Sequence, residues 1–116
     1  MDGLMCMAQA VYYEARGESR VGQEAIAHVI LNRGGKICKT VFKDCQFSWT
    51  CRTVQAPYGQ AWIDARDVAR SVLQGETEDP TNGATHFYSG KYKPGWALKF
   101  RFTVKIGAHK FYAAPE

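Results

Sequence analysis

The sequence has few of the features that mark membrane proteins, repeat proteins or low-complexity chains. Its apolar runs are only a few residues long, so we expect no segment of the 116 residues to insert stably into a membrane. No internal repeat is visible. The opening residues, MDGLMCMAQA, have an early aspartate and neither a basic nor an adequate apolar segment, so we expect no secretory signal. Length and composition predict one globular domain over residues 1–116.

Motifs for binding metals and nucleic acids are also missing. None of the cysteines forms a C-x-x-C pair, and no paired histidines follow at zinc-finger distance, so we expect no metal site. No signature of an RRM, KH or helix-turn-helix domain is present, so we expect no nucleic-acid partner. Nothing in the sequence indicates an organic cofactor, and we expect none.

Cysteine itself is abundant for so short a chain. Three of the four cysteines fall between residues 38 and 51. In an oxidising compartment we expect a disulfide within this segment, joining Cys45 to Cys51 or Cys38 to Cys45. Connectivity does not follow from spacing, and free thiols stay an open alternative.

A free thiol would allow a rival chemistry, that of a Cys–His peptidase or amidase. Cys45 or Cys51 would be the nucleophile, and His86 or His109 the base. Such nucleophiles usually stand at the start of a helix, where the dipole lowers the thiol pKa, and residues 45–51 show no helix start. This chemistry and a non-catalytic glycan-binding module are therefore the weaker alternatives.

The net charge is +4, and the basic residues are concentrated in two segments, residues 33–43 and 91–110. Such clusters favour an anionic partner, for example an acidic polymer. The alternative is a basic face that is simply solvated.

Apolar residues at helical spacing predict helices over residues 3–16, 20–33 and 60–74. A glycine follows each of them, and Ser19 is placed to cap the second. Residues 36–58 show no clear periodicity, and we expect an ordered loop or a short hairpin there.

The last third of the chain changes to a period of two. Apolar and polar residues alternate strictly from Leu98 to Ile106, as in a half-buried strand. Gly107 and Ala108 then suit a two-residue reversal into a returning strand, HKFY. The element order predicts an α+β domain with three main helices followed by a β-hairpin.

Glu14 stands in the stretch VYYEARGES, at the border of the apolar face of the first predicted helix and near its C-terminus. The negative end of the helix dipole and the neighbouring Met7, Tyr12 or Tyr13 would disfavour its ionised form. Both effects raise the pKa of a carboxyl group, which keeps a glutamic acid protonated as a general acid near pH 7. The alternative is a surface glutamate paired with a nearby arginine.

Glu18 lies four residues later. It is either a second carboxylate of the site or an anion at the N-terminus of the second helix, where the dipole favours it, and we prefer the second, structural and supporting role. Glu24, Asp64 and Asp67 are further carboxylates that a hydrolytic site could use, although no spacing singles one out.

The segment ATHFYSG places His86 among Phe87, Tyr88 and Tyr92. Rings mixed with hydroxyl groups suit the wall of a sugar-binding cleft, because a ring offers a flat apolar face. The alternative is an ordinary loop packed on the core. His28, beside the apolar stripe of the second helix, is expected to be a packed histidine and not a catalyst.

Several blocks of the sequence, in order, resemble the SleB-type cell-wall hydrolases, the family of spore-cortex-lytic enzymes and their bacterial and phage relatives. The blocks are AQAVYYEARGES with VGQEAIAHVILNR, then CQFSWTC, ATHFYSGKYKPGWA and IGAHKFY. They cover nearly the whole chain. The resemblance implies a lysozyme-like, lytic-transglycosylase-like α+β fold that acts on the glycan strands of peptidoglycan.

The same resemblance implies site residues. The family's catalytic glutamate is the first of its EARGE block, which here is Glu14. The aromatic and polar residues of the cleft would be Gln46, Phe47, Ser48, Trp49, His86, Tyr88 and Trp96.

Residues and resemblance agree on Glu14 as general acid and base, and the resemblance implies that the bond cleaved lies between N-acetylmuramic acid and N-acetylglucosamine. A hydrolase of the muramidase type would need a second carboxylate to activate water or trap the sugar. A lytic transglycosylase would not, because the sugar's own 6-hydroxyl group attacks at high effective concentration. Since no partner carboxylate stands out, we favour the transglycosylase, with the muramidase as the alternative.

The sequence departs from the spore members of the family in two respects. It has no peptidoglycan-binding repeat, and its middle is rich in cysteine, as in relatives from Gram-negative bacteria and their phages. A basic catalytic domain of this size resembles a phage endolysin, made in the host cytoplasm and released through a holin pore to reach the wall. We expect a monomer whose partner is peptidoglycan.

Overall fold

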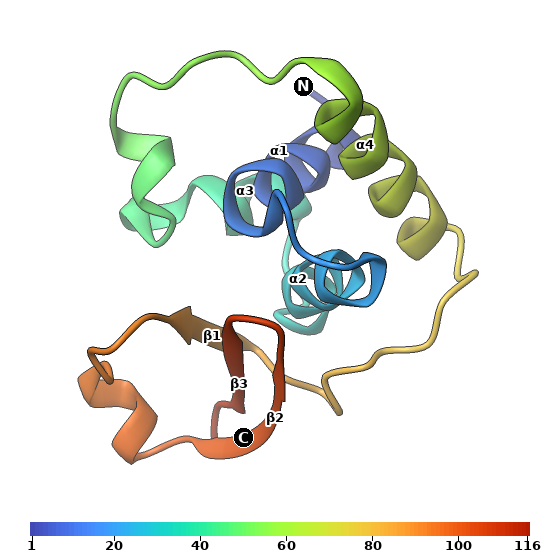
Figure 1. The fold of residues 1–116 in the computed structure, drawn as a ribbon. Coiled ribbons are helices and arrows are strands. Elements are labelled where there is room, and N and C mark those ends of the chain that lie inside the picture. Colours follow the sequence, from blue (N-terminus) through green and yellow to red (C-terminus); the bar gives the residue numbers. More distant parts are fainter.

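The computed structural model describes residues 1–116, and Figure 1 shows helices gathered on one side and a small sheet on the other. We call residues 1–75 the helical half and residues 84–116 the sheet half. The helical half contains α1 (Gly3–Ala15), α2 (Arg20–Asn32), α3 (Ile37–Phe42) and α4 (Gly59–Leu73), with short 3₁₀ turns η1 (Lys43–Cys45) and η2 (Ser48–Cys51). The sheet half contains β1 (His86–Ser89), η3 (Gly95–Leu98), β2 (Arg101–Ile106) and β3 (His109–Ala113).

The three helices predicted from periodicity are confirmed as α1, α2 and α4, each ending within one residue of the predicted bound. Side-chain caps explain why two of them begin where they do. The backbone N–H of Met5 donates to the Asp2 carboxylate at 2.9 Å, and that of Gly22 donates to the Ser19 hydroxyl at 3.1 Å. The predicted Ser19 cap is therefore present.

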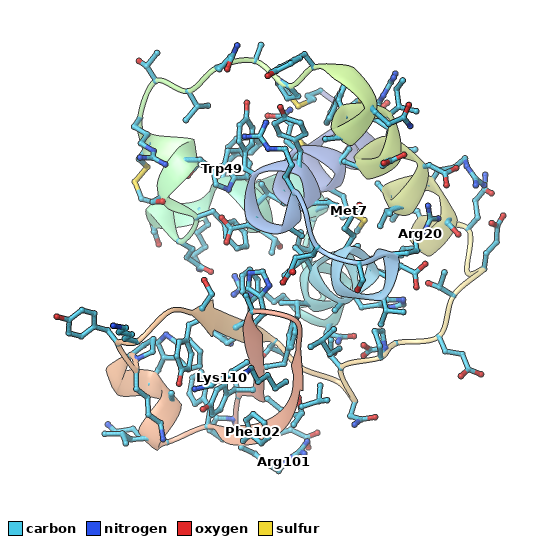
Figure 2. All side chains as sticks on the ribbon, in the orientation of Figure 1. Met7, Arg20, Trp49, Arg101, Phe102 and Lys110 are labelled. Atoms are coloured by element: carbon cyan, nitrogen blue, oxygen red, sulfur yellow. A yellow bond between two sulfur atoms is a disulfide. The ribbon has the colours of Figure 1, made fainter.

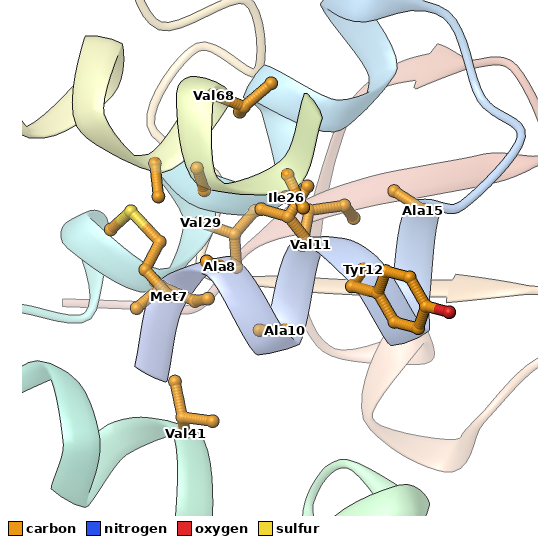
Figure 3. Close-up of a cluster of buried hydrophobic side chains, with 14 of the residues drawn as sticks. Met7, Ala8, Ala10, Val11, Tyr12, Ala15, Ile26, Val29, Val41 and Val68 are labelled. Atoms are coloured by element: carbon orange, nitrogen blue, oxygen red, sulfur yellow. The ribbon is translucent and has the colours of Figure 1, made fainter. Parts of the chain in front are cut away.

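Helix α1 is the centre of the core and packs against α2, α3 and α4. Its buried face includes Met7 and Val11, which meet Ile26, Val29 and Val68 from α2 and α4 (Figure 3). Truncating a fully buried side chain of this size costs about 2–5 kcal/mol of folding free energy. Well-packed neighbours on several sides therefore hold the helix that carries Glu14.

Residues 36–58 are more regular than the sequence indicated. They contain the helix α3 and the two 3₁₀ turns, and the expected hairpin is absent. Helix α3 has only six residues, fewer than two turns, so its apolar positions are too few to show a period.

Both pairs of cysteines form disulfides, so the alternative of free thiols is wrong. Cys45 joins Cys51, which confirms one of the two predicted pairings. The other pairing, Cys38 with Cys45, is wrong because α3 packs on α1 and Cys38 joins Cys6 there.

The predicted hairpin is confirmed as β2 and β3, joined at Gly107 and Ala108, where Gly107 has φ of +58°. The strict alternation is wrong in detail. Leu98 belongs to η3 and is exposed, and the register shifts between Phe102 and Val104, which leaves the Phe102 side chain half exposed. Such an irregularity breaks the two-residue period.

The sequence analysis missed the first strand. β1 pairs antiparallel with β3, so the sheet order is β1–β3–β2 and the last strand of the chain is the central one. β1 is only four residues long and pairs with residues twenty or more positions away. Nothing local distinguishes it from a loop.

None of the helices combines the length and the hydrophobicity that crossing a bilayer requires.

Candidate active site

Glu14 lies in the last turn of α1 and lines a cavity of about 290 Å³ between the helical half and the sheet half. Each half supplies part of the wall. The cavity is lined by Glu14, Arg33, Gln46, Phe47, His86, Phe87 and Trp96.

Burial raises the pKa of Glu14 above its ordinary value, as the sequence predicted. The source of the burial differs from the prediction. Met7 and Tyr12 are buried in the core, and the apolar walls around the carboxyl group are Phe47, Phe87 and Trp96, which come from distant segments. A protonated carboxyl group in such a site can donate its proton as a general acid.

Trp49 limits how far the pKa of Glu14 rises. Its buried indole N–H forms no hydrogen bond of ordinary geometry, but its partial positive charge lowers the pKa of Glu14 against the larger effect of burial. The indole is held between rings, stacked on Tyr13 at 4.7 Å and on Phe47 at 6.3 Å between centroids. Figure 2 shows Trp49 in the loop region beside α1. A fixed N–H donor stabilises the ionised form that must follow proton donation.

Arg33 follows α2 and connects the two halves. Its Nε donates to the carbonyl oxygen of Thr85 at 2.6 Å, and its Nη1 donates to the side-chain oxygen of Gln46. The guanidinium also lies over the Phe47 ring, 5.7 Å from its centre. Burial lowers the pKa of Arg33, and no carboxylate forms an ion pair with it.

Glu14 is the only carboxylate that lines the cavity. The other candidates are engaged elsewhere. Glu24 and Asp67 both bind Arg20, at 3.0 and 2.8 Å, and Asp64 accepts a hydrogen bond from Gln60.

Glu18 connects the turn after α1 to the reversal between β2 and β3. Its Oε1 accepts a hydrogen bond from the backbone N–H of Ala108 at 2.9 Å and lies 3.2 Å from Nδ1 of His109. A Cβ at Gly107 would come within 2.6 Å of the same carboxylate, so only glycine leaves room for this contact. Glu18 stands directly before Ser19, the N-cap of α2, and does not line the Glu14 cavity. The preferred structural role at the start of α2 stays a prediction, and the contact with the β2–β3 reversal was not expected.

Aromatic rings continue from the cavity along the sheet half. Trp96 lies 5.2 Å from His86 and 5.4 Å from Phe100 between ring centres. Tyr88 stacks on Tyr112 at 5.8 Å and touches the edge of Trp96. Together these rings form a wall that suits the apolar faces of sugars.

The structure thus brings together five of the residues expected in the site: Glu14, Gln46, Phe47, His86 and Trp96. Trp49 does not line the cavity but lowers the pKa of Glu14. Ser48, Tyr88 and Glu18 do not line the cavity.

One lining residue, Arg33, was missed, although it ends the block VILNR, which carried part of the family resemblance. Phe87 was expected only as one of the rings beside His86 in a sugar-binding wall, and it lines the cavity. A cation directly after the second helix, in a protein expected to bind an acidic polymer, was the available signal for Arg33.

The rival Cys–His chemistry has no nucleophile, since Cys45 and Cys51 are joined to each other. Of its proposed bases, His109 is buried, and burial lowers its pKa more than Glu18 raises it. His28 is buried and hydrogen-bonded to Thr77 at 2.8 Å, in line with the packed histidine we expected. No cluster of three or more His, Cys, Asp or Glu side chains is placed to hold a metal ion.

Comparison with known proteins adds the family. The Cell Wall Hydrolase family matches residues 17–112, a range that begins just after Glu14. Spore cortex-lytic enzymes of Halalkalibacterium halodurans and Oceanobacillus iheyensis are each 34% identical over 93% of this chain. The matched regions are 34% and 40% of those proteins, so this chain spans well under half the length of either relative.

Two solved structures have similar folds. The catalytic domain of the germination-specific lytic transglycosylase SleB from Bacillus anthracis gives a TM-score of 0.78 at 28% identity, covering 95% of this chain and 93% of that one. The catalytic domain of the Bacillus cereus SleB protein gives 0.71 at 28% identity, with 95% and 88% covered. The expected lytic-transglycosylase-like α+β fold is therefore confirmed.

Proposed function

This chain belongs to the Cell Wall Hydrolase family, and on that premise we propose that it cleaves the glycan strands of peptidoglycan as a lytic transglycosylase. The bond cut lies between N-acetylmuramic acid and N-acetylglucosamine. Glu14 acts first as the general acid and then as the general base.

In the first step, protonated Glu14 donates its proton to the glycosidic oxygen while the bond from that oxygen to C1 of the muramic acid breaks. The N-acetylglucosamine leaves with a new hydroxyl group, and an oxocarbenium-like centre develops at C1. In the second step, the 6-hydroxyl oxygen of the same muramic acid attacks C1, and its proton returns to Glu14. The product is an anhydro ring, and no water is consumed.

One observation carries this proposal: Glu14 is the only carboxylate in the cavity. Hydrolysis by either geometry needs two carboxyl groups flanking the bond. The intramolecular route needs one group that alternates between acid and base, and the raised pKa of Glu14 together with the Trp49 donor suits both of its forms. The similar protein from Bacillus anthracis is a lytic transglycosylase, which supports the same reaction here.

The two disulfides support a place of action outside the reducing cytoplasm, at the cell wall. Release through a phage holin and a monomeric state stay predictions.

Mass spectrometry of purified sacculi digested by the protein tests the reaction. The transglycosylase yields fragments with anhydro-muramic ends, each lighter by one water than the hydrolytic product. Fragments with reducing ends would establish the muramidase instead. Cut peptide stems with intact glycan would contradict both.

A further inference from the structure

A second, larger hollow adjoins the site. It encloses about 830 Å³ along α3 and the loop that precedes it, and we call it the basic groove. Its cations are Arg33, Lys36, Lys39 and Lys43, and its lining contains no Asp or Glu. Four positive groups around one hollow raise the local concentration of anions.

The basic groove and the Glu14 cavity share two lining residues, Arg33 and Gln46. These two side chains are hydrogen-bonded to each other, so they form a common wall between the hollows. A glycan strand that places a bond over Glu14 therefore has its nearest substituents within reach of the basic groove.

The cations of the basic groove are unpaired, unlike those on the opposite side of the helical half. There, Arg20 and Arg70 form ion pairs with Glu24, Asp67 and Glu76. Neither Arg33 nor any of the three lysines takes part in an ion pair. Of these cations Arg33 is partly buried and the three lysines are exposed. A partly buried cation without a counter-ion costs folding free energy, and a carboxylate that arrives at Arg33 offsets that cost.

We propose that the basic groove binds the free carboxylates of the peptide stems on muramic acid, which makes peptide-bearing glycan the preferred substrate. This rests on the proposed function. The stem is an acidic peptide attached to the very sugar whose C1 reacts, so it enters the groove whenever the strand occupies the cavity. The volume suits a short peptide, and Phe42 in the lining offers it an apolar contact.

The test compares soluble glycan fragments whose stems carry free carboxylates with the same fragments after those carboxylates are converted to carboxamides. For the unmodified protein we expect KM to be roughly tenfold lower for the carboxylate form, the ratio that 1.4 kcal/mol gives. A groove variant, Lys36→Gln/Lys39→Gln/Lys43→Gln, is expected to lose this preference at unchanged kcat.

The matched control removes the same number of charges from the sheet half, at exposed positions outside both hollows: Lys99→Gln/Arg101→Gln/Lys105→Gln. Arg101 lies at the outer end of that half (Figure 2). The control is expected to keep the preference for carboxylates. If both variants lose the carboxylate preference equally, the preference depends on net charge and the proposal is overturned. Equal KM values of the unmodified protein for the two substrates would also overturn it.

Binding measured by calorimetry separates this inference from the proposed function. If the isolated stem peptide binds only with free carboxylates and no glycan is cut, the reaction is wrong and the groove assignment stands. If anhydro products form without any carboxylate preference, the reaction stands and the groove assignment is wrong. The groove assignment would also be overturned if a phosphate polymer competes with the substrate for binding and the stem peptide does not.

Discussion

The two halves of the molecule contribute different chemistry to one cavity. The helical half supplies its formal charges, Glu14 and Arg33, from the ends of α1 and α2. The sheet half supplies rings, His86, Phe87 and Trp96, to which the helical half adds Phe47. Glu14 stands on a helix that packs closely in the core, whereas the three rings of the sheet half stand on the short elements β1 and η3.

This difference suggests that the helical half serves the reaction and that the sheet half serves recognition of the sugar. A general acid must stay fixed within a fraction of an ångström, and well-packed helices provide that. A sugar-binding wall tolerates small shifts, because a ring face offers area and few directed bonds. Changes in the helical half should therefore reduce kcat, and changes in the sheet half should raise KM.

Replacing the acid should have the largest effect. Glu14→Gln keeps the shape of the side chain but cannot donate a proton, so we expect kcat to fall at least about 10³-fold, within the range of general acid–base catalysis. The folded-state pKa of Glu14 is raised, so ionisation at neutral pH costs stability, and the variant should unfold at the same or a higher temperature.

Release of anhydro fragments from sacculi and a thermal melt measure the two effects. Glu18→Gln is the control, since Glu18 lies outside the cavity and its amide oxygen can still accept from Ala108. A Glu14→Gln protein that folds and still cuts glycan would refute the assignment.

The two disulfides should separate stability from activity. Cys6→Ser/Cys38→Ser opens a long loop between α1 and α3, and the chain-entropy relation gives a loss of about 4 kcal/mol in the free energy of unfolding. Cys45→Ser/Cys51→Ser opens a short loop, at about 2 kcal/mol, but that loop carries Gln46, Phe47 and Trp49.

We therefore expect the first variant to be the less stable and the second to be the less active at a temperature where both are folded. Denaturant unfolding and initial rates measured on the same preparations decide this. Equal rates in the two variants would show that the short disulfide does not position the site.

Removing a ring from the sheet half should weaken binding. Trp96→Ala deletes a ring that contacts both His86 and Phe100, and we expect KM to rise about tenfold with kcat little changed. Phe102→Ala is the matched control, because this ring is half exposed and does not line the cavity. A large fall in kcat for Trp96→Ala would contradict the division between the halves.

The contact between the halves can be tested at Gly107. Gly107→Ala suffers both a positive φ and a Cβ that overlaps the Glu18 carboxylate, and we expect a loss of about 1–3 kcal/mol in the free energy of unfolding. Gly34→Ala has a positive φ of +79° with no atom within 4 Å, so it reports the backbone effect alone, about 1 kcal/mol. If both variants lose the same amount, the Glu18 contact is not close.

A pH effect on stability should be the smallest. The folded-state pKa of His109 lies below its ordinary value of 6.5, mainly because of burial. As pH falls below about 6.5 the unfolded chain binds this proton first, so stability is complete above that pH and decreases through the folded-state pKa. His109→Gln should flatten this part of the stability curve, measured by denaturant unfolding between pH 5 and 8. If the pH dependence of the free energy of unfolding is unchanged in this variant, it comes from another group, such as His86, whose pKa is also lowered.

Much of the helical half could be predicted from the sequence, because its signals are local. Apolar periodicity, the Ser19 cap and the closing glycines are read within one helix each, and their bounds were right to one residue. The position of Glu14 at the border of an apolar face was also local, and it indicated a perturbed carboxyl group before any neighbour was known.

Tertiary structure decided what surrounds that carboxyl group. Phe47, Phe87 and Trp96 approach it from three separate segments, and β1 becomes a strand only because β3 offers it hydrogen bonds. The same holds for the pairing of Cys6 with Cys38 and for the meeting of the Glu14 cavity with the basic groove at Arg33. The sequence by itself determined which group can donate a proton. Its environment depends on contacts between distant residues, and local patterns do not encode these.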